Sequence, residues 1–333
     1  MSSTTIGVDL GGTKCHGVVL DAGGGILAEH RVPTPRGADN IIDAMAFVVE
    51  ALQDAVGAAP AAVGVGVPGM VDRAGVLQFA PNLPGVIGVD LPAAMAKRLP
   101  GMAFRFENDA TCAAWGERAH GAAAGSDDVV LVTLGTGIGG GIITDGQLFL
   151  GAHGFAGEVG HMVVDPQGPP CSCGSRGCWE RFASGSGLRR LALEAALAER
   201  IPRVVELAGG DPDDVKGEHV TAAAREGDAG ALAVIADFGW WLAVGLANLA
   251  NIFDPECFVV GGGLIAAGEL ILEPARAAFA TLVEAADHRP PIAIVAAVLG
   301  ERAGSIGAAA LARDTMTRDT GTRDTGTRDI RTS

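Results

Sequence analysis

The sequence predicts a protein of the α/β class. Short apolar segments that are typical of strands alternate along the chain with Ala- and Leu-rich segments that are typical of helices. A second indication is a pattern of strand, Gly-rich turn and strand that occurs once in each half of the chain. The length of 333 residues, of which 48% are apolar, is sufficient for the core of one large domain or of two ordinary ones.

The repeated pattern begins close to the N-terminus. Residues 5–10 and 16–21 are predicted strands, joined by a Gly-rich turn at residues 11–14. Residues 8–21 match residues 132–145 at five of fourteen positions, with a constant offset of 124. Glycine and valine are common in this chain, so the shared design of the two segments is stronger evidence than the identities themselves.

Between the two copies, strands and a helix alternate again. The Ala-rich residues 38–56 have the pattern of a helix, and the apolar run at residues 62–67 is typical of a short buried strand. Residues 104–107 are predicted as another strand, which leads into a helix that starts at Asp109.

The second half of the chain is more varied. A stretch rich in Gly, Pro and Cys extends to residue 180, and several Ala/Leu-rich helices follow up to about residue 253. Residues 257–260 form a predicted strand, and three glycines at 261–263 then open another helix. From Asp314 a near-perfect five-residue repeat with few large apolar side chains predicts a disordered tail over 314–333.

Charge and composition exclude several classes of function. The formal net charge is −15, which argues against a protein that coats nucleic acid, because phosphate backbones attract basic proteins. Residues 1–5 are polar and lead directly into a strand, so we expect no secretory signal and a cytoplasmic protein. The longest charge-free apolar segment, residues 238–253, contains Asn248 and Asn251 and is shorter than a membrane span. It predicts a buried helix.

The first Gly-rich turn has the residues of a phosphate-binding loop. Gly11 and Gly12 let backbone N–H groups approach a polyphosphate, and Thr13 adds a hydroxyl donor. Lys14 offers a mobile positive charge, and Asp9 can hold water around a Mg²⁺ ion. The spacings of a Walker A loop and of a dinucleotide-binding loop are both absent. A plain hairpin with a glycine turn remains the alternative.

The second turn carries five glycines within residues 134–141, more than a hairpin requires. If the two turns face one cleft, they would clamp a triphosphate from both sides. Gly261, Gly262 and Gly263 suit a third approach of backbone to ligand, for instance to an adenosine, or an ordinary turn from strand to helix.

Asp109 follows a strand and begins a helix, and two roles are open to it. It can cap the helix N-terminus. It can also accept the hydroxyl proton when a phosphoryl group is transferred to an alcohol, while Asn108 binds a neighbouring hydroxyl. The two roles can coexist.

Four residues have the spacing of a metal site. His161, Cys171, Cys173 and Cys178 provide one imidazole and three thiols, which close a tetrahedral site with no open position. The sequence therefore predicts a structural zinc ion, since a redox pair of thiols would favour a C-x-x-C spacing that does not occur here. Such a site would hold Glu158 and Glu180 close together in an otherwise flexible, Gly-rich segment, although either can be an ordinary surface charge.

Taken together, these residues resemble the ROK family of sugar kinases, and within it the bacterial glucokinases. The resemblance extends over about residues 8–313. The matching segments are VDLGGTK (8–14), PGMVD (68–72), NLPG (82–85), ENDA (107–110), LGTGIGGGII (134–143), GAHGFAGEVGH (151–161) and CSCGSRGCWE (171–180).

The resemblance implies an actin-like (ribonuclease H-like) ATPase fold with two domains around a cleft and a structural Zn²⁺ site. It implies a smaller domain of residues 1–120 with about 300–313, and a larger one of residues 121–299 with the zinc segment 161–178. The implied activity is that of an ATP-dependent kinase that phosphorylates glucose at its 6-hydroxyl, with ATP and Mg²⁺ as cofactors. Family members are often homodimers, so a homodimer or higher oligomer is expected.

The resemblance also assigns roles to single residues. Asp109 matches the catalytic base, and Asp9 matches the acid near Mg²⁺. The sugar-binding positions match Asn82, Asn108, Asp109, Glu158, His161 and Glu180, with the second ring nitrogen of His161 left for zinc. The phosphate loops match Gly11, Gly12, Thr13, Lys14, Gly135, Thr136 and Gly137, and the nucleotide end matches Gly262 and Gly263.

Other functions within and outside this family remain open. Val86 and Ile87 stand where many family glucokinases have an aromatic residue, which leaves the wall of the sugar pocket open. A kinase for N-acetylmannosamine, N-acetylglucosamine, mannose or fructose is the alternative. Polyphosphate is an alternative donor, although such relatives lack the zinc segment. The family also includes sugar-responsive repressors that carry a DNA-binding segment ahead of the kinase-like part. Only seven residues precede Val8 here, and the negative charge disfavours binding to DNA. We expect neither a nucleic acid nor a membrane as partner.

Overall fold

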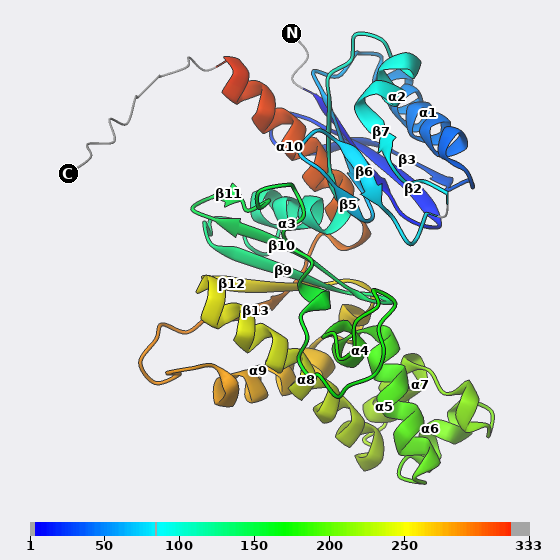
Figure 1. The fold of residues 1–333 in the computed structure, drawn as a ribbon, viewed down its shortest axis with the longest axis vertical. Coiled ribbons are helices and arrows are strands. Elements are labelled where there is room, and N and C mark those ends of the chain that lie inside the picture. Colours follow the sequence, from blue (N-terminus) through cyan, green and yellow to red (C-terminus); the bar gives the residue numbers. More distant parts are fainter. Residues whose placement is uncertain (1–3, 84, 321–333) are drawn as a thin grey trace.

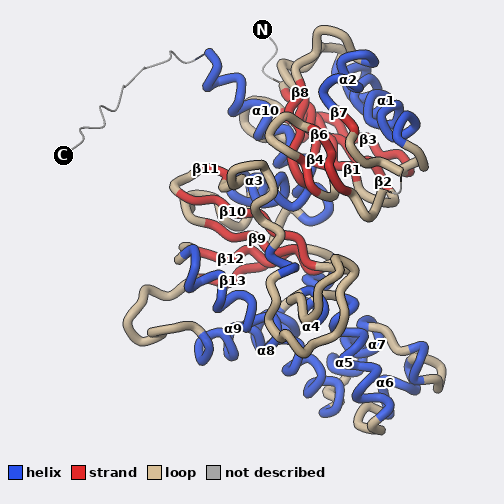
Figure 2. The backbone as a smooth tube through the Cα atoms, in the orientation of Figure 1, coloured by secondary structure: helices blue, strands red, loops and turns tan. Residues whose placement is uncertain are grey.

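The computed structural model describes residues 4–83 and 85–320, which form two lobes with two crossing helices between them (Figure 1). Each lobe is built on a five-stranded sheet, with strand orders β3-β2-β1-β4-β8 and β11-β10-β9-β12-β13. Figure 2 shows the strands of both sheets in red and the helices that cover them in blue. The predicted α/β class is confirmed.

The first sheet contains the predicted N-terminal hairpin at its centre. Its strands are β1 (Thr5–Leu10), β2 (Lys14–Leu20), β3 (Ile26–Pro33), β4 (Val63–Val67) and β8 (Phe104–Asn108). Strands β1, β2 and β3 are antiparallel neighbours, whereas β4 and β8 run parallel to β1. Alternate side chains of these strands point to opposite faces, as in any sheet. One face packs against α1 (Ala38–Val56) and α2 (Leu91–Arg98), and the other against α10 (Ala303–Thr320).

A small sheet lies beside the first lobe. It consists of β5 (Met70–Val71), β6 (Val76–Phe79) and β7 (Val89–Asp90) in the order β5-β6-β7. Its strands are antiparallel. The turn between β5 and β6 extends toward the second lobe, because the backbone N–H of Arg73 donates to the carbonyl oxygen of His153 at 3.2 Å.

The second sheet contains the second copy of the hairpin. Its strands are β9 (Val129–Leu134), β10 (Ile138–Thr144), β11 (Gln147–Leu148), β12 (Cys257–Gly261) and β13 (Ala293–Ala296). One face packs on α3 (Asp109–His120), and the other packs on the core formed with α8 (Ala229–Phe253) and α9 (Glu269–Leu282). Leu10 pairs with Cys15 in the first hairpin and Leu134 with Ile138 in the second, so the second turn is one residue shorter.

Smaller helices complete the second lobe around its core. They are α4 (Glu180–Ala183), α5 (Gly185–Leu197), α6 (Pro202–Leu207) and α7 (Gly217–Arg225), with short 3₁₀ turns η1 (Val159–His161), η2 (Pro212–Asp214), η3 (Gly263–Ala267) and η4 (Gly300–Arg302). The segment predicted as a buried helix is the second half of α8. This helix is long and apolar enough to cross a membrane by length and composition, and half of its most apolar window is buried inside the protein. Phe238, Leu242 and Leu246 lie in the core, whereas Trp240 and Ile252 are exposed.

Helices α3 and α10 cross between the two lobes at backbone contact distance (Figure 1). A Cβ atom on Gly307 of α10 would overlap the carbonyl oxygen of Cys112 in α3, and a Cβ on Gly64 of β4 would overlap that of Ala308. Larger residues at these glycines would separate the helix from its neighbours. The junction of the two lobes is therefore fixed by contacts that only glycine permits.

The end of α10 differs from the expected start of the tail. The helix continues through residues 314–320, and Asp314 accepts a hydrogen bond from Trp115 Nε1 at 3.0 Å. This bond between α10 and α3 gives the first residue of the repeat a partner in the fold. The remaining part of the predicted tail, residues 321–333, lies outside the described residues.

Candidate active site

Two carboxylates meet where three parallel strands end. Asp9 in β1 pairs with Gly66 in β4, and Gly66 pairs with Glu107 in β8. Asp109 follows two residues after Glu107 as the first residue of α3, and its Cα lies 3.5 Å from the position that a Cβ on Gly66 would take. Because Gly66 has no side chain, Asp109 can approach Asp9 across β4.

Burial changes the acidity of both carboxylates. Burial raises the pKa of Asp9 from 3.8 to about 7; the charge of Asp109 raises it as well, whereas Lys14 lowers it. Burial also raises the pKa of Asp109 to about 6, the backbone N–H of Ala110 lowers it, and Glu158 contributes a further increase. An acid with a pKa near the working pH can accept a proton and release it again, which is what a general base requires.

The capping role that the sequence left open for Asp109 belongs to Asn108. Asn108 Oδ1 accepts the backbone N–H of Thr111 at 3.0 Å, and its Nδ2 donates to the carbonyl oxygen of Gly69 at 3.1 Å. Asp109 accepts the N–H of its neighbour Ala110 at 2.8 Å, and the side chain of Asn108 also acts on its carboxylate. Its carboxylate is thus not needed to start the helix.

The first Gly-rich turn does not require glycine for its own shape. Gly11 and Gly12 do not adopt positive φ, and a Cβ on Gly12 would lie 3.4 Å from the carbonyl oxygen of Asn82, an ordinary contact. Gly11 has less room, since a Cβ there would lie 3.2 Å from the carbonyl oxygen of Lys14. Gly12 therefore leaves backbone exposed without a steric reason inside the protein, which favours the phosphate-binding interpretation over the plain hairpin. The ammonium of Lys14 forms an ion pair with Glu301 at 2.8 Å, so a bound phosphate would have to share it.

The five glycines of the second turn divide into two groups. Gly139, Gly140 and Gly141 pack against other segments, because a Cβ on each would lie within 3 Å of neighbouring atoms, including Ala110, Val159 and Ala114. The number of glycines alone was therefore a weaker argument for ligand binding than the sequence indicated. Gly135 has only one atom within 4 Å of its Cβ position, and a Cβ on Gly137 would meet the carboxylate of Glu180.

The third glycine segment is similarly mixed. Gly262 has a φ of 84°, and a Cβ there would lie 2.6 Å from backbone atoms of Leu134, so packing and conformation explain this glycine. Gly263 has open space around its Cβ position. The 3₁₀ turn η3 follows Gly262 directly, and α9 begins at Glu269.

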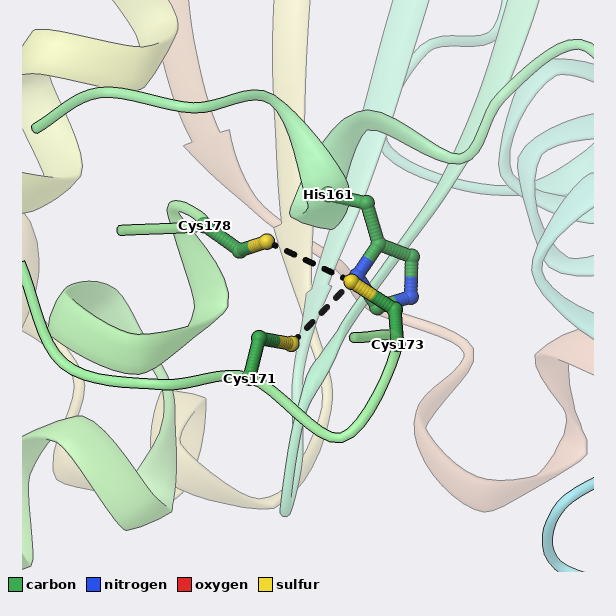
Figure 3. A group of neighbouring side chains, drawn as sticks. All are labelled: His161, Cys171, Cys173 and Cys178. Atoms are coloured by element: carbon green, nitrogen blue, oxygen red, sulfur yellow. Dashed lines mark hydrogen bonds between the residues drawn. The ribbon is translucent and has the colours of Figure 1, made fainter. Parts of the chain in front are cut away.

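The predicted metal ligands form one compact cluster (Figure 3). The ligand atoms of His161, Cys171, Cys173 and Cys178 all lie within 4.8 Å of one another. Cys171 Sγ lies 3.7 Å from His161 Nδ1, and Cys173 Sγ lies 3.6 Å from Cys178 Sγ. Donors bound to zinc in a tetrahedron are about 3.6 to 3.8 Å apart, given bond lengths of about 2.1 to 2.3 Å. The donor set and its spacing thus fit Zn²⁺.

The cluster is anchored in the core of the second lobe. Trp179, which follows Cys178, is fully buried and donates from Nε1 to the carbonyl oxygen of Trp241 in α8 at 2.8 Å. A Cβ on Gly245 of α8 would overlap the Trp179 ring, so the absence of a side chain at Gly245 leaves room for this ring. The segment is therefore held by the packing of Trp179 in the core as well as by the four metal ligands.

The two glutamates beside the cluster connect it to the carboxylates and turns. Glu158 Oε2 lies 3.9 Å from His161 Nε2, and Glu180 Oε1 lies 3.1 Å from Cys171 Sγ and 4.0 Å from His161 Nδ1. Glu158 also acts on the pKa of Asp109, and Glu180 touches the Cβ position of Gly137. An electrostatic interaction thus links the cluster to Asp109, and a contact links it to the second turn.

The chain matches the ROK family over residues 5–315. It belongs to the ROK family. It is 43% identical to a glucokinase of Streptomyces coelicolor over 313 residues, which are 93% of this chain and 98% of that protein. The crystal structure of a ROK family glucokinase from Streptomyces griseus in complex with glucose and AMPPNP aligns with a TM-score of 0.81 and 43% identity, covering 93% of this chain and 99% of that one.

As a ROK protein, the chain has the actin-like ATPase fold that its resemblance implied. The family is not uniform in function. A xylose repressor of Bacillus subtilis is 30% identical over 278 residues, which are 82% of this chain and 67% of the repressor. Family membership therefore establishes the fold, whereas the function has to be argued from the site.

Two residues that support the ROK site were not found from the sequence. Glu117 in α3 is fully buried and accepts the backbone N–H groups of Val298 and Leu299 at 3.2 and 2.8 Å, which ties α3 to the segment that leads into α10. Gly304 in α10 faces the carboxylate of Asp9, where a Cβ would lie 2.7 Å from its Cγ. The sequence offered two signals for these residues: Glu117 is an acid inside an Ala-rich helix, and Gly304 is a glycine near the start of another helix.

Proposed function

We propose that this protein is an ATP-dependent glucokinase, which transfers the γ-phosphoryl group of MgATP to the 6-hydroxyl of glucose. The similarity to glucokinases over nearly their full length supports the proposal, as does the structural likeness to one that was crystallised with glucose and AMPPNP. The single observation that carries the catalytic part is Asp109, a carboxylate with a pKa of about 6 beside Asp9, which is free of the helix cap.

In this proposal, Asp109 accepts the proton of the 6-hydroxyl as that oxygen attacks the γ-phosphorus. The bond from the γ-phosphorus to the bridging oxygen of ADP then breaks, and the proton remains on Asp109 until solvent removes it. The barrier is lowered mainly by positioning and by stabilisation of charge on the phosphoryl oxygens. Glu158 lies close enough to raise the pKa of Asp109, so it makes this base stronger.

The remaining candidate residues bind and orient the two substrates. We assign the sugar hydroxyls to Asn82, Asn108, Glu158, His161 and Glu180, with His161 using Nε2 for the sugar. The backbone N–H groups of Gly12, Thr13, Thr136 and Gly137, with the side chains of Thr13, Lys14 and Thr136, would hold the phosphates. Gly11 and Gly135 would shape the two turns, because their N–H groups donate to the carbonyl oxygens of Lys14 and Gly137 at 2.8 and 3.0 Å. Gly262 and Gly263 would border the nucleoside. Closure of the two lobes over these groups would exclude water, the competing phosphoryl acceptor.

Two metals complete the proposed enzyme. Bound Mg²⁺ would neutralise charge on the phosphates, and Asp9 is the carboxylate that would hold its water. A Zn²⁺ ion on His161, Cys171, Cys173 and Cys178 would act as a structural crosslink, because all four positions of its tetrahedron are filled by protein ligands. His161 Nδ1 faces Cys171 and would bind zinc, which leaves Nε2 for the sugar.

The test is a panel of acceptors and donors on zinc-replete protein, with release of ADP or loss of polyphosphate as the readout. Glucose should give the highest kcat/KM with MgATP. Mannose, fructose, N-acetylglucosamine and N-acetylmannosamine separate glucokinase from kinases for other hexoses. No turnover with any acceptor, together with binding to a DNA operator, would instead support the repressor branch of the family. Light scattering of the same preparation measures its mass and tests the expected homodimer or higher oligomer.

A further inference from the structure

Two segments from different lobes meet outside the carboxylates and turns described above. One is the turn between β5 and β6, and the other is the loop at residues 150–156 after β11. The guanidinium of Arg73 donates from Nε to the carbonyl oxygen of Gly151 at 3.1 Å, and its Nη2 donates to the same oxygen. The backbone N–H of Arg73 donates to the carbonyl oxygen of His153 at 3.2 Å. We call this contact the Arg73 latch.

Both sides of the Arg73 latch are held in shape by their own hydrogen bonds. Asp72 accepts the N–H groups of Ala74 and Val76 at 2.9 and 3.0 Å and a bond from Gln78 Nε2 at 2.8 Å, so the turn presents Arg73 in a fixed direction. The loop at 150–156 is closed by the N–H of Ala156, which donates to the carbonyl oxygen of Leu150 at 3.2 Å.

Gly154 brings the two backbones together. It has a φ of 98°, and a Cβ there would lie 2.8 Å from the carbonyl oxygen of Val71 and 3.0 Å from the nitrogen of Arg73. Next to this contact the surface has a depression of about 520 Å³, bordered by Arg73 and Gln78 on one side and by His153 and Phe155 on the other. The two segments are not packed against each other there, so the hydrogen bonds of Arg73 and the close approach at Gly154 carry the contact.

Each segment continues directly into one side of the proposed sugar site. The loop at 150–156 leads through Gly157 to Glu158, and a Cβ on Gly157 would lie 2.8 Å from the carbonyl oxygen of Gly140, so little slack separates the loop from Glu158. On the other side, β5 starts directly after Gly69, which accepts the hydrogen bond from Asn108 Nδ2. The latch thus spans from the Glu158 side of the site to the Asn108 side.

We propose that Arg73 is a positioning residue, which holds the loop that carries Glu158 against the Asn108 side of the site and thereby sets the affinity for the sugar. The proposal rests on the proposed function as a hexose kinase. Among the described residues, the hydrogen bonds of Arg73 reach neither the carboxylates nor the Gly-rich turns. Its loss should therefore weaken sugar binding in the ground state and in the transition state equally, which raises KM for the sugar and leaves kcat unchanged.

The experiment compares four variants by steady-state kinetics and thermal unfolding. Arg73→Ala should raise KM for glucose about 3- to 10-fold, the loss expected for one or two net hydrogen bonds, while kcat and KM for ATP stay within about twofold. Arg73→Lys, which can still donate to Gly151, should fall between Arg73→Ala and the unchanged protein. Gly154→Ala breaks the contact from the opposite side and should reproduce the effect of Arg73→Ala. Arg98→Ala is the matched control, an arginine of the same lobe whose partner is Asp43 in α1.

The double variant tests whether Arg73 and Gly154 act through one contact. Residues that act together give non-additive effects, so the KM of Arg73→Ala/Gly154→Ala should equal that of the weaker-binding single variant. If the increases in KM of the two single variants multiplied in the double variant, the two residues would act independently, and the proposed latch would be wrong. It would also be overturned if Arg73→Ala left KM for glucose unchanged, if it lowered kcat and the melting temperature instead, or if Arg98→Ala gave the same change.

Hydrogen exchange separates failure of the latch from failure of the proposed function. Without any sugar, amides of residues 150–157 should exchange faster in Arg73→Ala than in the unchanged protein, because the loop loses its tie to the other lobe. Unchanged exchange overturns the latch whatever the activity is. If the unchanged protein phosphorylates no hexose at all, the proposed function is wrong, and the exchange experiment still decides whether Arg73 holds the loop.

Discussion

Replacing Asp109 with asparagine should lower the rate of phosphoryl transfer and stabilise the fold at the same time. Burial raises the pKa of Asp109 from 3.8 to about 6, so the folded protein binds the proton more tightly than the unfolded chain does. Stability then falls as the pH rises from about 4 to 6, and the full destabilisation is present above pH 6. At pH 8 it amounts to about 1 to 3 kcal/mol, the lower figure allowing for the partial exposure of Asp109 to solvent.

Asparagine has nearly the same shape and still accepts the N–H of Ala110 through its oxygen. The variant therefore removes the charge and keeps the packing. It also removes the charge that raises the pKa of Asp9, which adds to the expected increase in the unfolding free energy. In contrast, kcat should fall by a factor of about 10² to 10⁴, the usual contribution of a positioned base.

The assay combines urea unfolding, followed by tryptophan fluorescence, with a coupled measurement of ADP release, both at pH 8. The unfolding free energy of Asp109→Asn should exceed that of the unchanged protein, and the difference should become smaller at pH 5. Asp54→Asn, on the exposed side of α1, is the matched control and should change neither quantity. An unchanged kcat removes Asp109 from the role of base. Loss of both activity and stability would show that the residue is structural.

Three further predictions follow from the same site. The value of kcat/KM for glucose should decrease below pH 6, because burial raises the pKa of Asp109 to about 6 and only the ionised carboxylate accepts a proton. A value of kcat/KM that is constant from pH 5 to 8 would contradict this. Cys173→Ser should lower the amount of bound zinc, measured by mass spectrometry, and destabilise the fold by about 3 kcal/mol or more. The control Cys257→Ser should keep the metal. Glucose affinity that survives the loss of metal would contradict the coupling between the zinc cluster and the sugar site. Gly12→Ala should change the unfolding free energy by less than about 1 kcal/mol and raise KM for ATP. Gly64→Ala, in which the new Cβ would overlap Ala308, should instead destabilise the fold by about 2 kcal/mol or more. A Gly12→Ala protein that is unstable yet binds ATP normally would reverse that assignment.

Local patterns in the sequence were sufficient for much of the fold. The helix predicted at residues 38–56 is α1 with the same bounds, and the helix predicted from Asp109 begins there. Both hairpins form as expected, because alternating apolar residues on either side of a Gly-rich turn determine strand pairing over a short range. The metal cluster was also accessible, since its ligands are constrained by spacing within one segment.

Features that depend on distant segments were not accessible in this way. The sequence does not reveal that α3 crosses β10, and this crossing explains Gly139 and Gly141 by packing rather than by ligand binding. The role of Gly307 depends on a contact with Cys112, nearly two hundred residues earlier. The repeat after Asp314 has too few apolar residues to predict a helix. The structure nevertheless continues α10 through residues 314–320, where Asp314 bonds to Trp115.

The position of the phosphate on the product tests most directly whether this site performs the proposed chemistry. Zinc-replete protein, MgATP and glucose would be incubated, and the product examined by phosphorus NMR with proton coupling. We expect ADP and one phosphate ester whose phosphorus couples to the two protons on the sixth carbon of glucose. A phosphorus coupled to the anomeric proton, or no ester at all, would contradict the account.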